Sequence, residues 1–484
     1  MTALERTSHD VRTYGFATDP DRSSEDDRSP EIQIAEYYRS AAIRSRIAEY
    51  CDGEPEHSQG FRAFGLAGYG GKRRLRLPED APMPLRVEDF QTLLDDGADV
   101  CRSLADQGGT LIQIDIDYVD PENAEDIHLQ PADCFARIEP IYREVCSAFH
   151  SYGVPTIDLL TARGYHLSTR IPAGSPFHAA ILEIGNIGAP LLSKYNALGG
   201  AAWVRLGRAH EGAGRLLEYL VHRIIRNLSG KTEIPVVLAD VPRAGGGPYV
   251  CLDLSAHGDP LFERNIRCAF SSNQKTRDLT PSRPFTINVP CRSQPLPRLL
   301  QARENLAEAT QLAECVHTVI PDARGDDLRW VEEYRGGDLA RFHEAFDRGR
   351  HDPPEKWPQT YDRIDLGSLP PCVRLPLEQP NPALLQPVWI RTLALALWGM
   401  GWHPRSVAGL IRSKYERDFG WGSMWYRYDA AARADFYVRL FCGAMACGID
   451  PGFSCEFQAA RGACPLPNCA YALSDYKNTI ERRQ

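Results

Sequence analysis

The chain has 484 residues, of which 43% are apolar and 25% charged, and its 55 basic and 64 acidic residues give a net charge of −9. At roughly 150 residues per domain, this length predicts two to four domains with a sizeable core and excludes disorder throughout. The composition excludes fibrous and repeat proteins. The most apolar stretch, residues 383–402, is interrupted by polar residues and is too short for the ~20 residues that span a bilayer, so we expect no membrane protein.

Residues 1–30 are charged and rich in Ser and Asp, and they lack the apolar core of a secretory signal. We expect a disordered tail there. Fourteen cysteines in a long chain without an export signal indicate a reducing compartment, and we expect a cytoplasmic protein. Residues 366–484 carry 13 basic against 9 acidic residues, a net of +4 that leaves −13 for the rest of the chain. The C-terminal quarter therefore differs in net charge from the rest of the chain, which indicates a different electrostatic role. Nucleic-acid binding needs only one basic face, so the negative total charge does not exclude it.

Hydrophobic periodicity indicates alternating helices and strands in the first part of the chain. The predicted helices cover residues 31–52, 87–105, 137–152, 179–198 and 216–228. The predicted strands cover residues 111–119 and 248–254, with a hairpin at 156–160 and 164–171. This alternation predicts an α/β or α+β domain over residues 31–290.

The remainder of the chain is predicted to be mainly helical. Residues 291–365 look like a helical linker region, with charged helices at 302–315 and 326–348 and a Pro-rich connector after them. Residues 366–484 predict a second, cysteine-rich domain, with helices at 384–398, 405–415 and 430–445.

Two carboxylates alternate along the predicted strand 111–119. Residues two apart on a strand face the same side, so Asp115 and Asp117 present their oxygens to one point while their apolar neighbours face the core. Such oxygen ligands suit Mg²⁺ or Mn²⁺, and a pair of these ions serves phosphoryl transfer. The alternative is a strand end whose acids merely face water.

A short polar segment begins the second strand of the predicted hairpin. Arg163, Gly164 and His166 place a cation, a flexible residue and an imidazole together, and the glycine permits close approach of a ligand to the backbone. Arg and His in this setting suit a polyphosphate. Alternatively, His166 is a hydrogen-bonded structural histidine.

A third carboxylate, Asp253, is embedded in an apolar strand, where burial is costly unless the group is paired or metal-bound. Close behind it, Arg267, Ser271 and Lys275 supply cations and a hydroxyl, a candidate cradle for a triphosphate. The alternative is a solvated basic loop.

In this order, the motifs Asp-x-Asp, Arg-Gly-x-His, an apolar-flanked Asp and Arg-x-x-x-Ser-x-x-x-Lys resemble the catalytic domain of the archaeo-eukaryotic primase superfamily, over residues 31–290. The resemblance implies an RRM-like sheet. It implies that two divalent ions, Mg²⁺ or Mn²⁺, are bound by Asp115, Asp117 and Asp253. It also implies that the incoming nucleotide's triphosphate is held by Arg163, His166, Arg267, Ser271 and Lys275.

The chain departs from this family's pattern at two points. Ser271-Ser272-Asn273 stands where many relatives have Ser-Leu-His, and Cys134 lacks the paired cysteines of the zinc knuckle that many primase small subunits contain.

Three cysteines close to the C-terminus and one much earlier form a second candidate site; they are Cys372, Cys455, Cys464 and Cys469. Four thiolates hold a zinc ion or an iron–sulfur cluster. Zinc modules typically contain Cys-x2-Cys pairs, which are absent here, so we favour a [4Fe–4S] cluster over zinc. Buried free thiols are the remaining alternative.

The cysteine-rich segment resembles the C-terminal iron–sulfur domain of the primase large subunit. The resemblance rests on Leu369-Pro-Pro-Cys372, the helix with Arg391 that ends at Trp398-Gly-Met-Gly401, Trp425-Tyr426-x-Tyr428 and the final cysteines. Aromatic and basic residues here suit stacking on bases and contact with phosphates of a single-stranded template, or they fill a helical core. These residues are Trp421, Trp425, Tyr426, Arg427, Tyr428 and Arg433.

Together these features predict a single-chain DNA primase or primase-polymerase that joins nucleoside triphosphates on a single-stranded DNA template. The chain has no Gly-x4-Gly-Lys-Ser/Thr motif, so unwinding requires a partner such as a helicase or another replication, repair or defence protein. One rival is a metal-dependent nuclease that uses the same carboxylates on water, although hydrolysis needs no triphosphate site. The other is a catalytically silent module that binds nucleic-acid ends.

Overall fold

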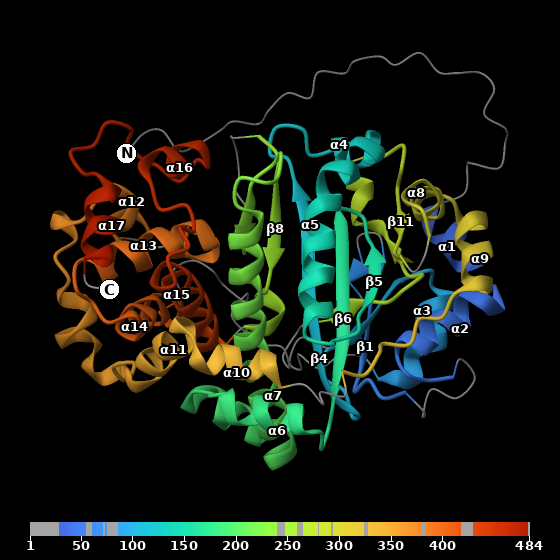
Figure 1. Cartoon of the computed structure of the whole chain (residues 1–484), viewed down its shortest axis with the longest axis horizontal. Helices are drawn as coiled ribbons and strands as arrows, with labels where there is room; N and C mark the ends of the chain where they lie inside the picture. The colour runs from blue at the N-terminus through green and yellow to red at the C-terminus, as the bar shows by residue number, and fades with distance from the viewer. Residues whose placement is uncertain are drawn as a thin grey trace.

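The computed structural model describes residues 29–54, 61–70, 73–74, 86–239, 247–258, 265–278, 280–291, 294–323, 328–378, 383–417 and 429–482. Strands and helices alternate up to residue 290, and helices and short 3₁₀ turns follow in the rest of these ranges (Figure 1). The expected mixed α/β class is therefore confirmed. The predicted tail up to residue 28 and the aromatic segment 421–428 lie outside the described residues.

A six-stranded sheet forms the centre of the first part. In spatial order its strands are β12 (Val289–Pro290), β5 (Ile157–Leu160), β6 (Gly164–Pro172), β4 (Gly109–Val119), β8 (Tyr249–Asp253) and β7 (Val236–Leu238). Neighbouring strands are antiparallel except β7 and β8, which are parallel. The strands and the hairpin predicted for β4, β5, β6 and β8 are confirmed. The second half of central β4 alternates as expected, because Ile114 and Ile116 are fully buried while Asp115 and Asp117 are partly exposed.

The second group of strands contains the main error of the sequence prediction. A four-stranded sheet consists, in spatial order, of β2 (Arg73–Arg74), β1 (Leu66–Gly70), β3 (Asp99–Ser103) and β9 (Asn265–Arg267). A separate two-stranded sheet consists of β10 (Ser272–Asn273) and β11 (Thr286–Ile287). The predicted helix 87–105 is wrong beyond residue 95, since α3 (Phe90–Asp95) is followed by strand β3. Gly97, at φ +62°, makes the turn between them, and a Cβ there would collide with the carbonyl oxygen of Glu31.

Helices cover the sheets of the first part. They are α1 (Pro30–Tyr37), α2 (Ala41–Tyr50), α4 (Asp126–Leu129), α5 (Pro131–Ser151), α6 (Pro176–Ile184), α7 (Ala189–Leu228), α8 (Leu296–Glu304) and α9 (Leu306–Cys315). The predicted helix 31–52 is divided into α1 and α2, and residues 179–198 are divided between α6 and α7. Helix α5 lies on one face of the large sheet, where Tyr142 stacks on Tyr165 of β6 with 4.0 Å between ring centroids. The opposite face bears His166.

The C-terminal helices are α10 (Arg329–Gly336), α11 (Asp338–Arg348), α12 (Pro371–Glu378), α13 (Pro387–Gly399), α14 (Pro404–Glu416), α15 (Ala430–Ala446), α16 (Cys455–Ala460) and α17 (Leu473–Glu481). The helices predicted at 384–398, 405–415 and 430–445 are confirmed as α13, α14 and α15. Helices α10 and α11, within the expected linker region, pack against α6 and α7 on one side and α14 and α15 on the other (Figure 1).

Buried charges join α7 to the C-terminal helices. Glu218 of α7 lies 3.2 Å from Nε2 of His343 on α11 and 3.4 Å from Nε of Arg439 on α15. Arg439 also forms a 2.6 Å ion pair with Glu211 of α7. Burial alone would raise the pKa of Glu218, but His343 and Arg439 outweigh it and lower the pKa below its ordinary value. The ionised carboxylate therefore fastens the three helices together.

Replacing Glu218 by Ala should lower the free energy of unfolding by roughly 1–3 kcal/mol, because the buried His343 loses its carboxylate partner and the buried Arg439 keeps only Glu211. The lowered pKa also means that the contribution of Glu218 is complete above its ordinary pKa of 4.5 and is lost on further acidification. Urea unfolding at pH 7 and at pH 4 measures both effects. A matched control is Glu183→Ala, which removes an exposed α6–α10 pair with Arg335 and should change stability by less than about 1 kcal/mol. Equal effects of the two substitutions would contradict the assigned role of Glu218.

Candidate active site

Three neighbouring strands place the predicted carboxylates in one row. Asp115 of β4 lies directly opposite His166 of β6 on one side and Asp253 of β8 on the other. Asp117 lies two residues further along β4, opposite Gly164. Paired residues, and residues two apart on a strand, share a face of the sheet. The three carboxylates and the imidazole therefore project from the same face, and each is half-buried. We call these four side chains the carboxylate row.

Hydrogen bonds hold the carboxylate of Asp115 in place. Gln113 Nε2 donates to Asp115 Oδ1 at 2.8 Å, and Ser168 Oγ donates to Gln113 Oε1 at 2.9 Å. The Ser168 hydroxyl in turn lies 3.3 Å from the Tyr50 hydroxyl at the end of α2. From the neighbouring strand β6, His166 Nε2 lies 3.5 Å from Asp115 Oδ1. The position of Asp115 is thus set by the sheet and by α2 together.

The environment of Asp115 favours its protonated form. Burial is the main cause, and it raises the pKa of Asp115 to about 6. The imidazole of His166 opposes this shift, while the negative charges of Asp117 and Asp253 add to it. A proton and a metal ion would therefore compete for Asp115 close to neutral pH.

The other two carboxylates have separate partners. Arg163 Nη2 lies 3.3 Å from Asp117 Oδ2, and about half of the Arg163 side chain is exposed (48%). The charge of Asp117 raises the pKa of Arg163. Asp253 accepts hydrogen bonds from the backbone N and the Oγ of Ser255, at 2.7 and 3.0 Å. Arg163 therefore combines a carboxylate partner with access from solvent.

Gly164 is required by the packing of the sheet itself. A Cβ at this position would collide with the carbonyl oxygen of Ile116 on β4. The close approach of the neighbouring strand is therefore sufficient to require a glycine here, and its expected role toward a ligand stays a prediction. Two residues on, Nδ1 of His166 is buried and has no hydrogen-bond partner among the described residues. Such an atom is costly unless rearrangement or a ligand satisfies it.

The remaining predicted residues belong to the second group of strands. Arg267 of β9 forms a 3.1 Å ion pair with Asp99 of β3. Ser271 is fully buried, and its Oγ accepts a 2.7 Å hydrogen bond from the backbone N of Val100. Lys275, in the following 3₁₀ turn, is exposed. The structure therefore gathers Arg163 and His166 around the carboxylates, while Arg267 and Ser271 have other partners, and their role at a triphosphate stays a prediction.

Asp99 is a polar centre that the sequence analysis missed. It is 1% exposed, and it accepts hydrogen bonds from Ser272 Oγ at 2.6 Å and from the backbone N of Gln274 at 3.1 Å. Burial raises the pKa of Asp99 above its ordinary value, although Arg267 opposes the shift. The sequence offered one signal for this strand, the apolar Val100-Cys101 pair that follows Asp99. Such a pair fits a buried strand as well as a helix, so it did not distinguish the two.

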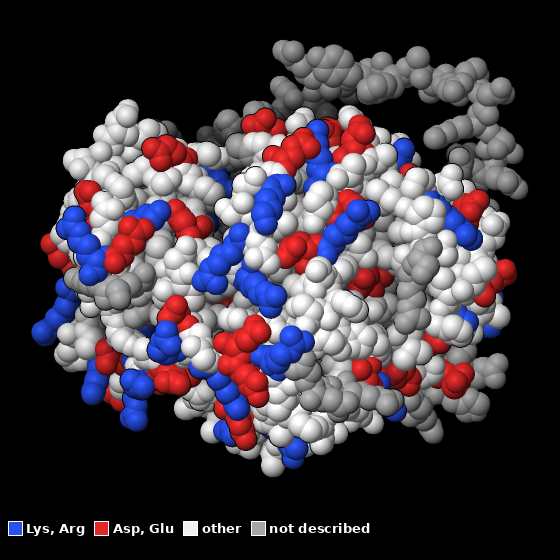
Figure 2. All heavy atoms as spheres, in the orientation of Figure 1, with Lys and Arg blue, Asp and Glu red and all other residues white. Residues whose placement is uncertain are grey.

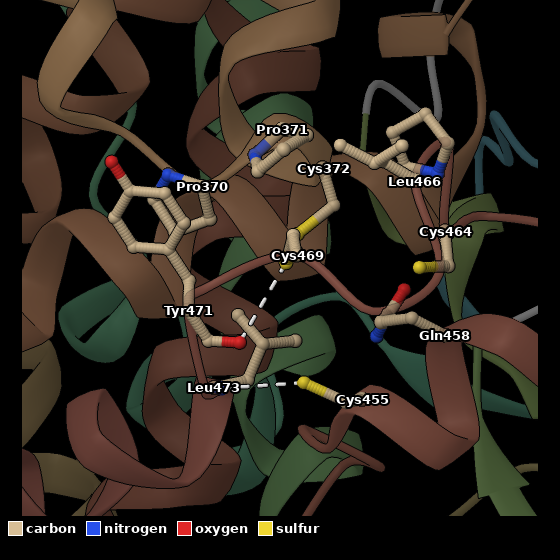
Figure 3. A pocket seen from close by; sticks show the side chains of 11 residues that line it. Pro370, Pro371, Cys372, Cys455, Gln458, Cys464, Leu466, Cys469, Tyr471 and Leu473 are labelled. Carbon is tan, nitrogen blue, oxygen red and sulfur yellow. Dashed lines mark hydrogen bonds between the residues drawn. The ribbon is translucent and has the colours of Figure 1, made fainter.

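The four predicted cysteines line one pocket beside α12 and α16 (Figure 3). Its other walls are mainly proline and aliphatic side chains with one tyrosine, namely Pro370, Pro371, Pro465, Leu466, Tyr471 and Leu473, together with Gln458. The pocket thus joins Cys372, at the start of the C-terminal region, to the three cysteines at its end.

The thiols are close enough to influence one another. Burial, followed by the nearby Cys464, Cys455 and Cys469, raises the pKa of Cys372 to about 12. The backbone N of Leu473 donates to Cys455 Sγ at 3.4 Å. Nevertheless, within the described ranges no group of three or more His, Cys, Asp or Glu side chains is gathered tightly enough to hold a metal ion as it stands. Both proposed metal sites therefore remain predictions.

Charged side chains of both signs are intermixed on the face that Figure 2 shows. Among the described residues, the basic side chains visible on that face do not form a continuous surface. In the described part of the chain, no helix has the length and apolar character needed to cross a bilayer.

Comparison with solved structures gives a distant similarity. No family model matches the chain, and no curated protein matches it. Among solved structures, the polymerase domain of Mycobacterium tuberculosis ligase D in complex with DNA is similar over 63% of this chain and 92% of that chain. The TM-score is 0.34 and the sequence identity 12%, too low to carry an argument about this chain.

Mn²⁺ should stabilise the protein more at pH 7 than at pH 5. Because the pKa of Asp115 is raised from 3.8 to about 6, its contribution to stability is complete below pH 3.8 and is lost as the pH rises through 6. A bound cation would offset that loss by pairing with the ionised row. Differential scanning calorimetry at both pH values, with and without Mn²⁺, measures the effect. Asp115→Asn should abolish the pH dependence of the increase in melting temperature that Mn²⁺ causes. An unchanged Mn²⁺ response in that variant would contradict the assignment of Asp115 as a metal ligand.

Proposed function

We propose that the protein is a DNA-templated nucleotidyltransferase of the primase or primase-polymerase kind. The observation that supports this proposal most directly is the register that sets Asp115 between Asp253 and His166, with Asp117 beside them. Three carboxylates on adjacent strands, next to a half-exposed arginine, provide ligands for cations and a contact for phosphate on one face.

Asp115, Asp117 and Asp253 would hold two Mg²⁺ or Mn²⁺ ions, which when bound activate the 3′ hydroxyl and neutralise charge on the α-phosphate and pyrophosphate. The row itself supplies negative charge at fixed positions, because all three residues lie on strands. Gln113 holds one oxygen of Asp115, and Ser255 holds both oxygens of Asp253. These bonds orient the carboxylates before any ligand arrives.

Arg163 and His166 are the proposed contacts of the incoming triphosphate. Both now lie beside carboxylates of the row, Arg163 near Asp117 and His166 near Asp115. With cations held by the three carboxylates, Arg163 and His166 would be available to phosphate oxygens, which a guanidinium binds through paired N–H groups. The exposed Lys275 can join them. Arg267 and Ser271 would have to leave Asp99 and Val100 to do so.

Replacing both Asp115 and Asp117 by Ala should reduce nucleotide addition by more than about a hundredfold, since even outer-shell changes at metal sites lower activity by 10–100-fold. The assay uses the full chain, unprimed single-stranded DNA, labelled nucleoside triphosphates and Mg²⁺ or Mn²⁺. Asp338→Ala, which removes an exposed carboxylate on α11, is the matched control and should retain activity.

Two results would overturn the proposed activity. One is wild-type incorporation by the double variant, which would remove the carboxylates from the chemistry. The other is degradation of the DNA without incorporation, dependent on the same two aspartates, which would establish a nuclease.

We further propose that the cysteine pocket binds a [4Fe–4S] cluster. Four thiols from two distant segments line it, and Cys-x2-Cys pairs typical of zinc modules are absent from the chain. The mainly apolar walls would limit water around such a centre, which is one way a protein tunes its potential. Zinc is the alternative that the same thiols allow.

Protein purified without oxygen should be brown and contain about four irons per chain. Cys464→Ser should lose the colour and the iron, and it should lose initiation on unprimed DNA more than extension of a primer, because the carboxylate row lies in the other region. Cys315→Ser, at an exposed cysteine outside the pocket, is the control and should retain both. Stoichiometric zinc without iron would replace the cluster by a structural zinc centre.

A further inference from the structure

The cysteine-bearing segment contacts the catalytic sheet through Arg461, the residue that follows α16. The Arg461 guanidinium carbon lies 4.8 Å from the ring centroid of Tyr249, on β8, and 4.0 Å from that of Phe457, on α16. Arg461 is 8% exposed and Tyr249 1% exposed. This cation is therefore enclosed between an aromatic ring of each region, a geometry in which cation–π attraction is strengthened by desolvation.

Tyr249 belongs to the same face of the sheet as the carboxylate row. It pairs with Val119 of β4, two residues beyond the pair formed by Cys251 and Asp117. Because alternate residues of a strand share a face, Tyr249 lies on the face of Asp253 and about 7 Å along the strand from the level of Asp117. The contact with Arg461 is thus made on the carboxylate face.

The stack continues into the helical region. The guanidinium carbon of Arg391 also lies 4.6 Å from the Phe457 ring centroid, and Arg391 is a fully buried residue of α13. Guanidinium and aromatic groups therefore alternate from α13 to β8. We call Arg391, Phe457, Arg461 and Tyr249 the cation–aromatic column.

The same short helix carries part of the cysteine pocket. Cys455 is the first residue of α16, and Gln458, one turn later, also lines the pocket. Helix α16 has only six residues, too few to be stable alone. Whatever orders Cys455 must therefore also order Phe457, and through it Arg461.

We propose that Arg461 is a positioning residue that couples the four-cysteine site to nucleotide addition, by holding α16 against β8 on the carboxylate face. The proposal rests on the proposed function and adds a physical connection between its two sites. Arg461 acts by fixing the two aromatic rings between which it lies.

The test compares Arg461→Ala, Arg461→Lys and Cys464→Ser in the full chain. Arg461→Ala should slow initiation on unprimed DNA by about tenfold, the loss expected for one desolvated cation–π contact. Arg461→Lys should recover part of the rate, because lysine keeps the charge but not the flat stacking surface. Arg412→Ala is the matched control, since Arg412 lies 5.9 Å from the ring of Trp357 within the C-terminal region, and it should leave initiation unchanged.

Amide hydrogen exchange provides a readout independent of activity. Arg461→Ala and Cys464→Ser should each increase exchange in residues 249–253, and the double variant should increase it no further, because both act through α16. Tyr249→Leu, which breaks the column from the sheet side, serves if Arg461→Ala does not fold. Additive effects, or unchanged exchange in residues 249–253, would overturn the coupling. This outcome is distinct from failure of the proposed function, which the Asp115/Asp117 double variant reports separately.

Discussion

The site depends on the electrostatic conflict among three carboxylates held on adjacent strands. The register of β4 and β8 leaves Asp115, Asp117 and Asp253 no freedom to separate, so their repulsion has to be relieved by protons or cations. In the protein alone, relief comes from Arg163, from His166 and from the raised pKa of Asp115. If a cation were bound to the carboxylates, the same two basic side chains would be available to a phosphate.

Buried charge serves a second purpose between the two regions. Glu218 holds His343 and Arg439, while the cation–aromatic column holds α16 on β8 at a separate place. Contacts with different physics therefore join the helical region to the sheet region. The ion pairs fix the long helices, whereas the column fixes a six-residue helix that has little intrinsic stability.

Local patterns in the sequence predicted the strands that carry the site. The alternation in the second half of β4 and the hairpin of β5 and β6 each involve only residues that are close together in the chain. These patterns also predicted that Asp115 and Asp117 share a face. The pairing of Asp115 with both His166 and Asp253 depends on strand register, which the sequence alone does not fix. The residues around Asp99 were misread as helix because β3 is buried along its whole length and shows no alternation.

The partners of hydroxyl and thiol groups also depend on segments far apart in the chain, which local sequence patterns do not reveal. Ser271 and Ser272 look equivalent in the sequence, yet Ser271 binds the backbone of β3 and Ser272 binds Asp99. Which partner each serine takes is decided by the position of β3, a strand far away in the chain. For the cysteines the outcome is the reverse, because Cys372 and the last three line one pocket despite their separation. Their convergence requires the segments around α12 and α16 to lie together, and Arg461, the residue that follows α16, touches Tyr249 of β8. A ligand at the cysteines would therefore stabilise a contact made on the carboxylate face.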